Sequence, residues 1–75
     1  MDAEAWIASF AGEADGTPPT ETETGKLLKL AAVAAHSSER IAAPLACWIA
    51  GREGLDLDEA LAMAERIGKG EEESA

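Results

Sequence analysis

Residues 26–35 read KLLKLAAVAA, and this stretch decides the fold class. Alanine and leucine favour helix, whereas strands favour β-branched and aromatic residues. Leu27, Leu30, Ala31 and Ala34 recur at the spacing that places side chains on one face of a helix. That face is broadened by Leu28, Ala32 and Ala35. We therefore expect the central helix of an all-α protein here. No segment of the sequence alternates apolar and polar residues over a useful length, as a half-buried strand would.

Two capping signatures predict helix starts on either side of this stretch. Thr20-x-x-Glu23 predicts that the central helix begins between residues 20 and 24. Asp56-x-x-Glu59 predicts a last helix, which Gly68 should end at the C′ position. The apolar stripe of this last helix comprises Leu57, Leu61, Ala64 and Ile67.

A further helix is expected before the central one. Asp2 can cap it, and Trp6 and Phe10 belong to its apolar stripe. Gly12 or Gly16 should end it, because glycine readily takes the positive φ that a turn requires. Two prolines follow, and they mark a loop.

Pro44 fixes the register of one more helix. Proline is tolerated in a first helical turn but costs about 3 kcal/mol deep inside a helix, so the helix should begin within residues 41–43. Gly51 or Gly54 should end it. We expect its core face to comprise Leu45, Trp48 and Ile49, and we expect Trp6, Phe10 and Trp48 to fill the interior.

These elements predict a compact all-α bundle of about four short helices in residues 1–68. Residues 69–75 read KGEEESA, which predicts a disordered acidic tail. A chain of 75 residues buries only a modest core. A homodimer could therefore complete the interior.

The net charge of −9 argues against nucleic acid and anionic membranes as partners. The only cysteine is Cys47, so a reducing compartment is expected. We see no signal peptide and no apolar run long enough to cross a bilayer. The cytoplasm is therefore the expected location.

One polar cluster interrupts the apolar pattern, where the central helix should pass to the next. It contains His36, Ser38, Glu39 and Arg40. One hypothesis makes it a binding site for a small anion, held by Arg40 and by amide groups at the start of the following helix. The simpler interpretation is a structural corner, in which these side chains cap carbonyls and turn the chain.

Catalysis has little support in the sequence. Cys47 and His36 could be read as a nucleophile and its base, but Cys47 lies in an apolar helix, where free cysteine is usually a buried small hydrophobe. Ser38 lacks a nucleophile-elbow sequence. One histidine and one cysteine cannot build a zinc site alone. We therefore predict no enzyme activity, no cofactor and no metal.

Trp48 is the residue best suited to contact a partner, although core packing is its simpler explanation. We expect a non-catalytic accessory or protein-interaction module. The alternative is a domain that binds a small anionic ligand at the His36–Arg40 corner.

Residues 27–51 resemble a small bacterial helical family of unknown function. The residues that carry the resemblance are the AAHSSER run at residues 34–40, then Ala43, Pro44, Leu45 and Gly51. The same sequence is similar to a domain found fused to molybdenum-cofactor guanylyltransferase, which joins a guanine nucleotide to molybdopterin. The resemblance implies an accessory role, with a molybdenum-cofactor synthesis enzyme as the partner. It supplies no catalytic residues.

Overall fold

The computed structural model describes residues 1–70, and within them it contains helices and no strand. The helices are α1 (Ala3–Glu13), α2 (Glu21–Ser37), α3 (Ala42–Arg52) and α4 (Leu57–Gly68). The predicted all-α class is therefore confirmed. Of the tail predicted to be disordered, only residues 69 and 70 are described, and they form a turn; residues 71–75 lie outside the described residues.

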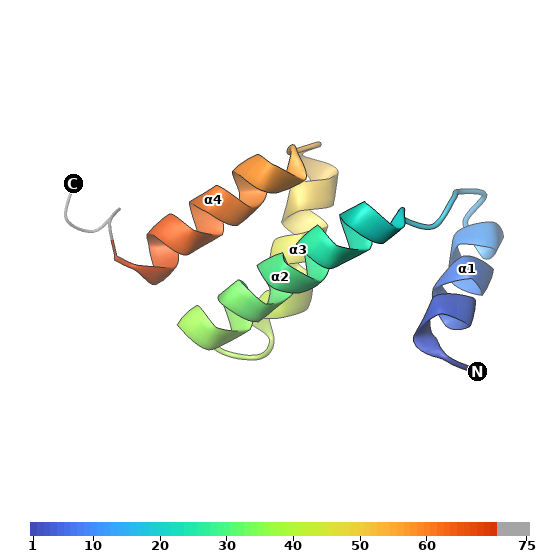
Figure 1. Cartoon of the computed structure of the whole chain (residues 1–75), viewed down its shortest axis with the longest axis horizontal. Coiled ribbons are helices and arrows are strands. Elements are labelled where there is room, and N and C mark those ends of the chain that lie inside the picture. Colours follow the sequence, from blue (N-terminus) through green and yellow to red (C-terminus); the bar gives the residue numbers. More distant parts are fainter. Residues whose placement is uncertain (71–75) are drawn as a thin grey trace.

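The long helix α2 is the centre of the molecule, as predicted. Both α3 and α4 pack against it. Figure 1 shows that α1 lies beyond the start of α2, at one end of the molecule, and that the last turn of α4 lies at the other end. The molecule extends 43 × 22 × 18 Å along its principal axes. The position of any interior is therefore set by α2, α3 and α4.

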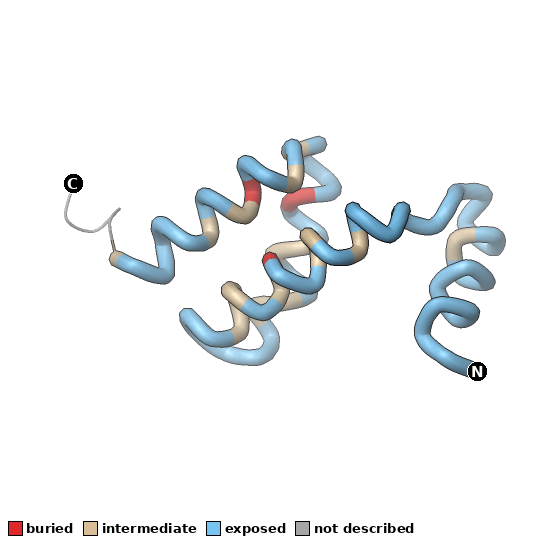
Figure 2. The backbone as a smooth tube through the Cα atoms, viewed as in Figure 1, coloured by how far each residue is buried: buried red, intermediate tan, exposed pale blue. Residues whose placement is uncertain are grey.

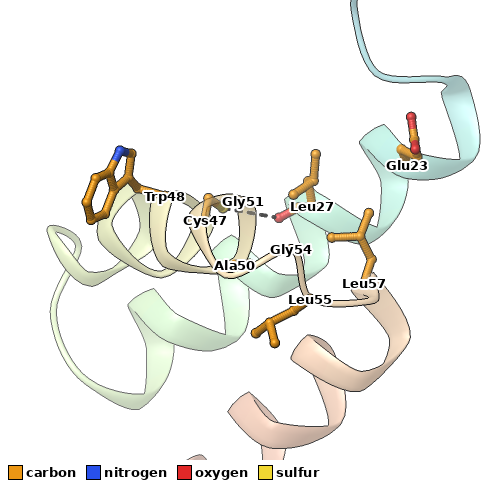
Figure 3. Close-up of a pocket in the computed structure, with 9 residues that line it drawn as sticks. All are labelled: Glu23, Leu27, Cys47, Trp48, Ala50, Gly51, Gly54, Leu55 and Leu57. Atoms are coloured by element: carbon orange, nitrogen blue, oxygen red, sulfur yellow. Dashed lines mark hydrogen bonds between the residues drawn. The ribbon is translucent and has the colours of Figure 1, made fainter.

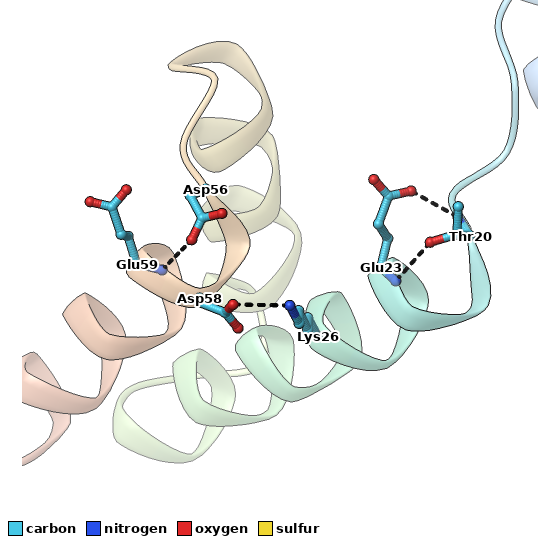
Figure 4. Close-up of polar contacts among 6 residues, drawn as sticks. All are labelled: Thr20, Glu23, Lys26, Asp56, Asp58 and Glu59. Atoms are coloured by element: carbon cyan, nitrogen blue, oxygen red, sulfur yellow. Dashed lines mark hydrogen bonds and ion pairs between the residues drawn. The ribbon is translucent and has the colours of Figure 1, made fainter.

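The predicted capping residues begin three of the helices. Thr20 and Glu23 form a complete capping box: the Thr20 hydroxyl accepts from the Glu23 amide at 3.1 Å, and the Glu23 carboxylate accepts from the Thr20 amide at 2.8 Å (Figure 4). Asp56 accepts from the Glu59 amide at 3.2 Å. Asp2 caps α1 in the same way. These contacts satisfy amides that have no partner within the helix.

Helices α1 and α3 end in the same way: a residue with a positive φ follows the helix, and the next amide donates to the carbonyl five residues before it. The residue with the positive φ is different in the two helices. At the end of α3, Gly54 takes a φ of 64°, and the Leu55 amide donates to the Ala50 carbonyl at 3.0 Å. At the end of α1, Asp15 takes the left-handed conformation, with a φ of 59°. The prediction that Gly16 would take a positive φ there is therefore wrong. Aspartate tolerates this region better than most residues, because its short polar side chain bonds locally.

The prediction that Gly68 provides the left-handed stop of α4 is also wrong. Gly68 is the last helical residue, and Gly70 takes the positive φ of 75°. Gly68 instead allows a close approach to the end of α2. A Cβ atom at this position would lie 2.6 Å from the Ser37 hydroxyl oxygen, which is too close for two unbonded atoms.

The interior is small and consists mainly of alanine and leucine. Leu30 of α2, Ala50 of α3 and Ala60 of α4 are its buried residues (Figure 2). Half-buried side chains surround them: Cys47, Leu55, Leu61 and Ala64. The inward face predicted for α2 is confirmed at Leu27, Leu30, Ala31 and Ala34, but Leu28 and Ala32, which were expected to broaden it, are exposed. In α4 the predicted stripe holds except for Ile67, which is exposed at its end.

The predicted core face of α3 is wrong. Leu45, Trp48 and Ile49 are exposed, and α3 instead turns its small residues toward α2. Those small residues are Ala42, Ala43, Ala46, Cys47 and Ala50. Helix axes approach most closely where small side chains meet, because large ones hold the backbones apart. The close approach buries Ala50 and Leu30 together and leaves the large side chains outside.

Trp6 and Phe10 do not fill the interior either. Their exposed fractions are 54% and 60%, because α1 does not pack on the body formed by α2, α3 and α4. Their rings stack on each other, with centroids 5.4 Å apart and planes within 10° of parallel. The aromatic residues of α1 therefore lie on the surface.

Two leucines of α2 should differ sharply in their contribution to stability. Leu30→Ala removes a side chain that is 4% exposed and should cost about 2–5 kcal/mol, which is enough to unfold a domain of modest stability. Leu28→Ala, at a side chain that is 67% exposed, should change stability by less than about 0.5 kcal/mol. Urea denaturation followed by circular dichroism measures both. Equal effects would contradict the core described above.

Two glycines should respond to alanine in opposite directions. Gly25 lies inside α2, and an added methyl group there would meet open space, so Gly25→Ala should stabilise by about 0.5–1 kcal/mol. Gly68→Ala must displace the Ser37 hydroxyl, which donates to the Val33 carbonyl at 2.7 Å, and it should destabilise by about 1 kcal/mol. Denaturant midpoints give both values, and a stabilising Gly68→Ala would show that α4 lies farther from α2.

Candidate functional site

The predicted corner residues lie on the exposed connection between α2 and α3. His36 is in the last turn of α2, and Ser38 ends the helix, its amide donating to the Ala34 carbonyl at 3.2 Å. Glu39 and Arg40 follow, and all four predicted side chains are exposed. The structure thus places these residues on one short segment, as expected from their sequence order.

The amides that were expected to receive an anion at this corner are already used. The Ala42 amide donates to the Glu39 carbonyl at 2.9 Å, and the Ala43 amide donates to the Arg40 carbonyl at 3.2 Å. The third residue of α3 is Pro44, which has no amide proton. The first turn of α3 therefore offers an anion no amide group that is not already bonded.

Cys47 and His36 do not form a nucleophile–base pair. The Cys47 thiol faces α2, where its sulfur lies 3.9 Å from the Leu27 carbonyl oxygen (Figure 3). Leu27 precedes His36 by nine residues, or roughly 13 Å along the helix axis. Burial raises the pKa of the Cys47 thiol, so its reactive thiolate is disfavoured. Within residues 1–70, no group of His, Cys, Asp and Glu side chains could hold a metal ion.

Trp48 lies apart from the corner, on a different surface. It belongs to a stripe that we call the α3 outer face, which comprises Ile41, Leu45, Trp48 and Ile49. Each of these four side chains is between 45% and 66% exposed. The Arg52 guanidinium lies 4.4 Å from the centroid of the Trp48 ring, where it makes a cation–π contact at the end of the stripe.

Sequence reasoning considered Trp48, together with Leu45, for an incompletely covered face, but not Ile41 or Ile49. The signal for the rest was present: residues 41–51 contain no charged side chain, so α3 has no polar face to turn toward water. A helix that is apolar on all sides is normally buried. Since only one side of α3 packs on α2, the large apolar side chains of the other side remain exposed.

A groove borders the α3 outer face, between α2 and the turn that joins α3 to α4. Its volume is about 610 Å³. Figure 3 shows its lining: Glu23, Leu27, Cys47, Trp48, Ala50, Gly51, Gly54, Leu55 and Leu57. The lining is mainly apolar. It contains one carboxylate, that of Glu23, which accepts from the Thr20 amide.

A second cleft, of about 380 Å³, lies between α1 and the start of α2. Ile7 of α1, both prolines of the linker and Leu28 of α2 contribute to its walls. The structure therefore places α1 beside the linker, with Trp6 and Phe10 outside this cleft.

Near the groove, one ion pair joins α2 to α4. The Lys26 ammonium lies 3.0 Å from a carboxylate oxygen of Asp58 (Figure 4). Water reaches both side chains, which are 37% and 68% exposed, so the pair contributes only about 0–1 kcal/mol. It orients two helices without forming a site.

The fold and these surfaces define a small all-α domain with an exposed apolar helix face. The chain matches the family described as Domain of unknown function (DUF6457) over residues 1–74, and it belongs to that family. The expected resemblance to a small family of unknown function is thereby confirmed. No curated protein and no solved structure matches the chain significantly. No helix in residues 1–70 has both the length and the apolar character needed to cross a membrane.

The Cys47 thiol should react slowly with a disulfide reagent at neutral pH. Its raised pKa lowers the thiolate fraction, and its position against α2 limits access. The rate should rise as the pH increases toward the raised pKa, and unfolding in urea should increase it at any pH. Reaction of the folded protein at pH 7 as fast as that of the urea-unfolded chain would contradict this placement.

Proposed function

We propose that this protein is a non-catalytic accessory module that binds a protein partner through the α3 outer face. The observation that carries the proposal is the orientation of α3. Its small side chains meet α2, and four large apolar side chains are left facing water.

Apolar surface that remains in contact with water costs free energy, and covering it with another surface removes that cost. Soluble monomers rarely expose large contiguous apolar patches, and those that do occur often mark interaction sites. Trp48 and Arg52 add the residue types that contribute most to binding at protein interfaces. The spacing of Ile41, Leu45 and Trp48 suits a partner helix that lies along α3.

For the identity of the partner, the resemblance described above favours a molybdenum-cofactor synthesis enzyme, the guanylyltransferase in particular. The single cysteine favours the reducing cytoplasm as the place where the two would meet. The alternative hypothesis of anion binding at residues 36–40 has less support, because the amides of α3 are used within the chain.

The test is binding of the purified chain to a purified molybdenum-cofactor guanylyltransferase, measured by calorimetry. Leu45→Glu should weaken binding at least tenfold, because it places a charge in the centre of the apolar face. Leu28→Glu is the matched control, since Leu28 is also an exposed leucine but lies on α2. Circular dichroism should show that both variants keep their helices.

Absence of binding by the unmodified chain would reject this partner class. Equal binding by the Leu45→Glu and Leu28→Glu variants would reject the α3 outer face as the site.

A further inference from the structure

We propose that the groove beside Trp48 is an anchor pocket, which receives one large apolar side chain of the partner together with a lysine or arginine that adjoins it. This role of the groove rests on the proposed function of the α3 outer face, and it defines the chemistry that the partner must bring to one end of that face. Trp48 belongs both to the exposed stripe of α3 and to the lining of the groove, so the two surfaces are continuous.

The middle of the groove is formed by residues that have little or no side chain. In the view of Figure 3, Gly51 and Gly54 lie between Trp48 at one end and Glu23 at the other. A methyl group added at either glycine would meet no atom within 4 Å. The volume of about 610 Å³ is in the range of roughly 300–1,000 Å³ that is usual for pockets that bind small ligands. The groove therefore has room for a large side chain.

Nothing within the folded chain requires glycine at position 51. Gly51 lies in the last turns of α3 without a positive φ, in a place where alanine would stabilise the helix more. Glycine at such a position lets another molecule come close to the backbone. Gly25 of α2 also has open space beside it, but it does not line the groove, and it therefore provides a matched control.

Glu23 supplies the only charge in the lining of the groove. Its carboxylate accepts from the Thr20 amide at 2.8 Å, and this capping bond holds the side chain in place. Neither of the two ion pairs found in residues 1–70 includes Glu23. A lysine or arginine of the partner would therefore complement the groove, whereas an acidic side chain would be repelled.

The stripe and the groove select different properties of a partner. Residues 41–51 carry no charge, and Arg52 at the end of the stripe is paired with Glu53 at 3.0 Å. The stripe therefore favours apolar surfaces without distinguishing among their charges. Binding free energy is concentrated where a large side chain fills a pocket and excludes water. The groove offers such a pocket next to a carboxylate, and it thereby gives the interface its specificity.

Tryptamine is a suitable probe of the groove, because it carries an indole ring and an ammonium group on one short chain. Titration of the isotope-labelled chain, followed by NMR, should shift the methyl signals of Leu27, Leu55 and Leu57, which line the groove. The signals of Ile7, in the second cleft, should not move. The neutral analogue tryptophol should bind roughly two- to fivefold more weakly, which is the contribution expected of an exposed ion pair.

Two variants change the groove in different ways. Gly51→Leu fills it and should weaken the binding of tryptamine at least about tenfold. Glu23→Gln removes the charge but keeps an oxygen that can complete the capping box, so tryptamine should bind this variant no better than tryptophol does. Gly25→Leu is the matched control and should leave the affinity unchanged. Circular dichroism should show that all three variants keep their helices.

The same variants separate the anchor pocket from the proposed function. Gly51→Leu should weaken binding to the guanylyltransferase at least about tenfold, and Gly25→Leu should not. Unchanged binding of the enzyme by Gly51→Leu would overturn the anchor pocket, and the α3 outer face would still stand as the site if Leu45→Glu weakens binding.

The anchor pocket is also overturned if tryptamine leaves the groove signals unshifted, or if it binds Gly51→Leu as well as the unmodified chain. If the enzyme does not bind, while tryptamine binds in a way that depends on Gly51 and Glu23, the partner class is rejected and the anchor pocket is supported.

Discussion

The contact of Leu30 with the small residues of α3 and α4 is the interaction on which the rest of the structure depends. Only Leu30, Ala50 and Ala60 are buried among the described residues, so little apolar surface holds the helices together. Alanine contributes little area of its own, but it lets a neighbouring helix come close enough to cover a leucine. That closeness requires α3 to turn its narrow side inward, and it thereby determines which side chains of α3 face water.

The features that could be predicted from the sequence are those that depend on local chemistry. The capping box of Thr20 and Glu23 involves groups only three residues apart, so its presence in the sequence is nearly sufficient for its formation. The position of Pro44 in a first turn follows from the geometry of proline in the same way. The inward face of α2 could be predicted as well, because Leu27, Leu30, Ala31 and Ala34 recur at helical spacing.

The rotation of α3 could not be obtained by the same reasoning. A pattern of apolar residues indicates the buried face only when polar residues occupy the opposite one, and α3 has no such contrast. Choosing its large side as the core face was reasonable for an isolated helix and wrong for one packed on alanines. The aromatic residues of α1 were misplaced for a related reason: an amphipathic stripe predicts that something covers it, without saying whether this belongs to the same chain.

Both tryptophans of this protein, Trp6 and Trp48, lie outside the interior formed by α2, α3 and α4. Their indole rings already meet water in the folded chain, so their fluorescence should change little when that interior melts. The same emission should shift to shorter wavelength when another surface comes to rest on α1 or α3. The tryptophan fluorescence of this chain should therefore report contact of α1 or α3 with another surface better than it reports unfolding.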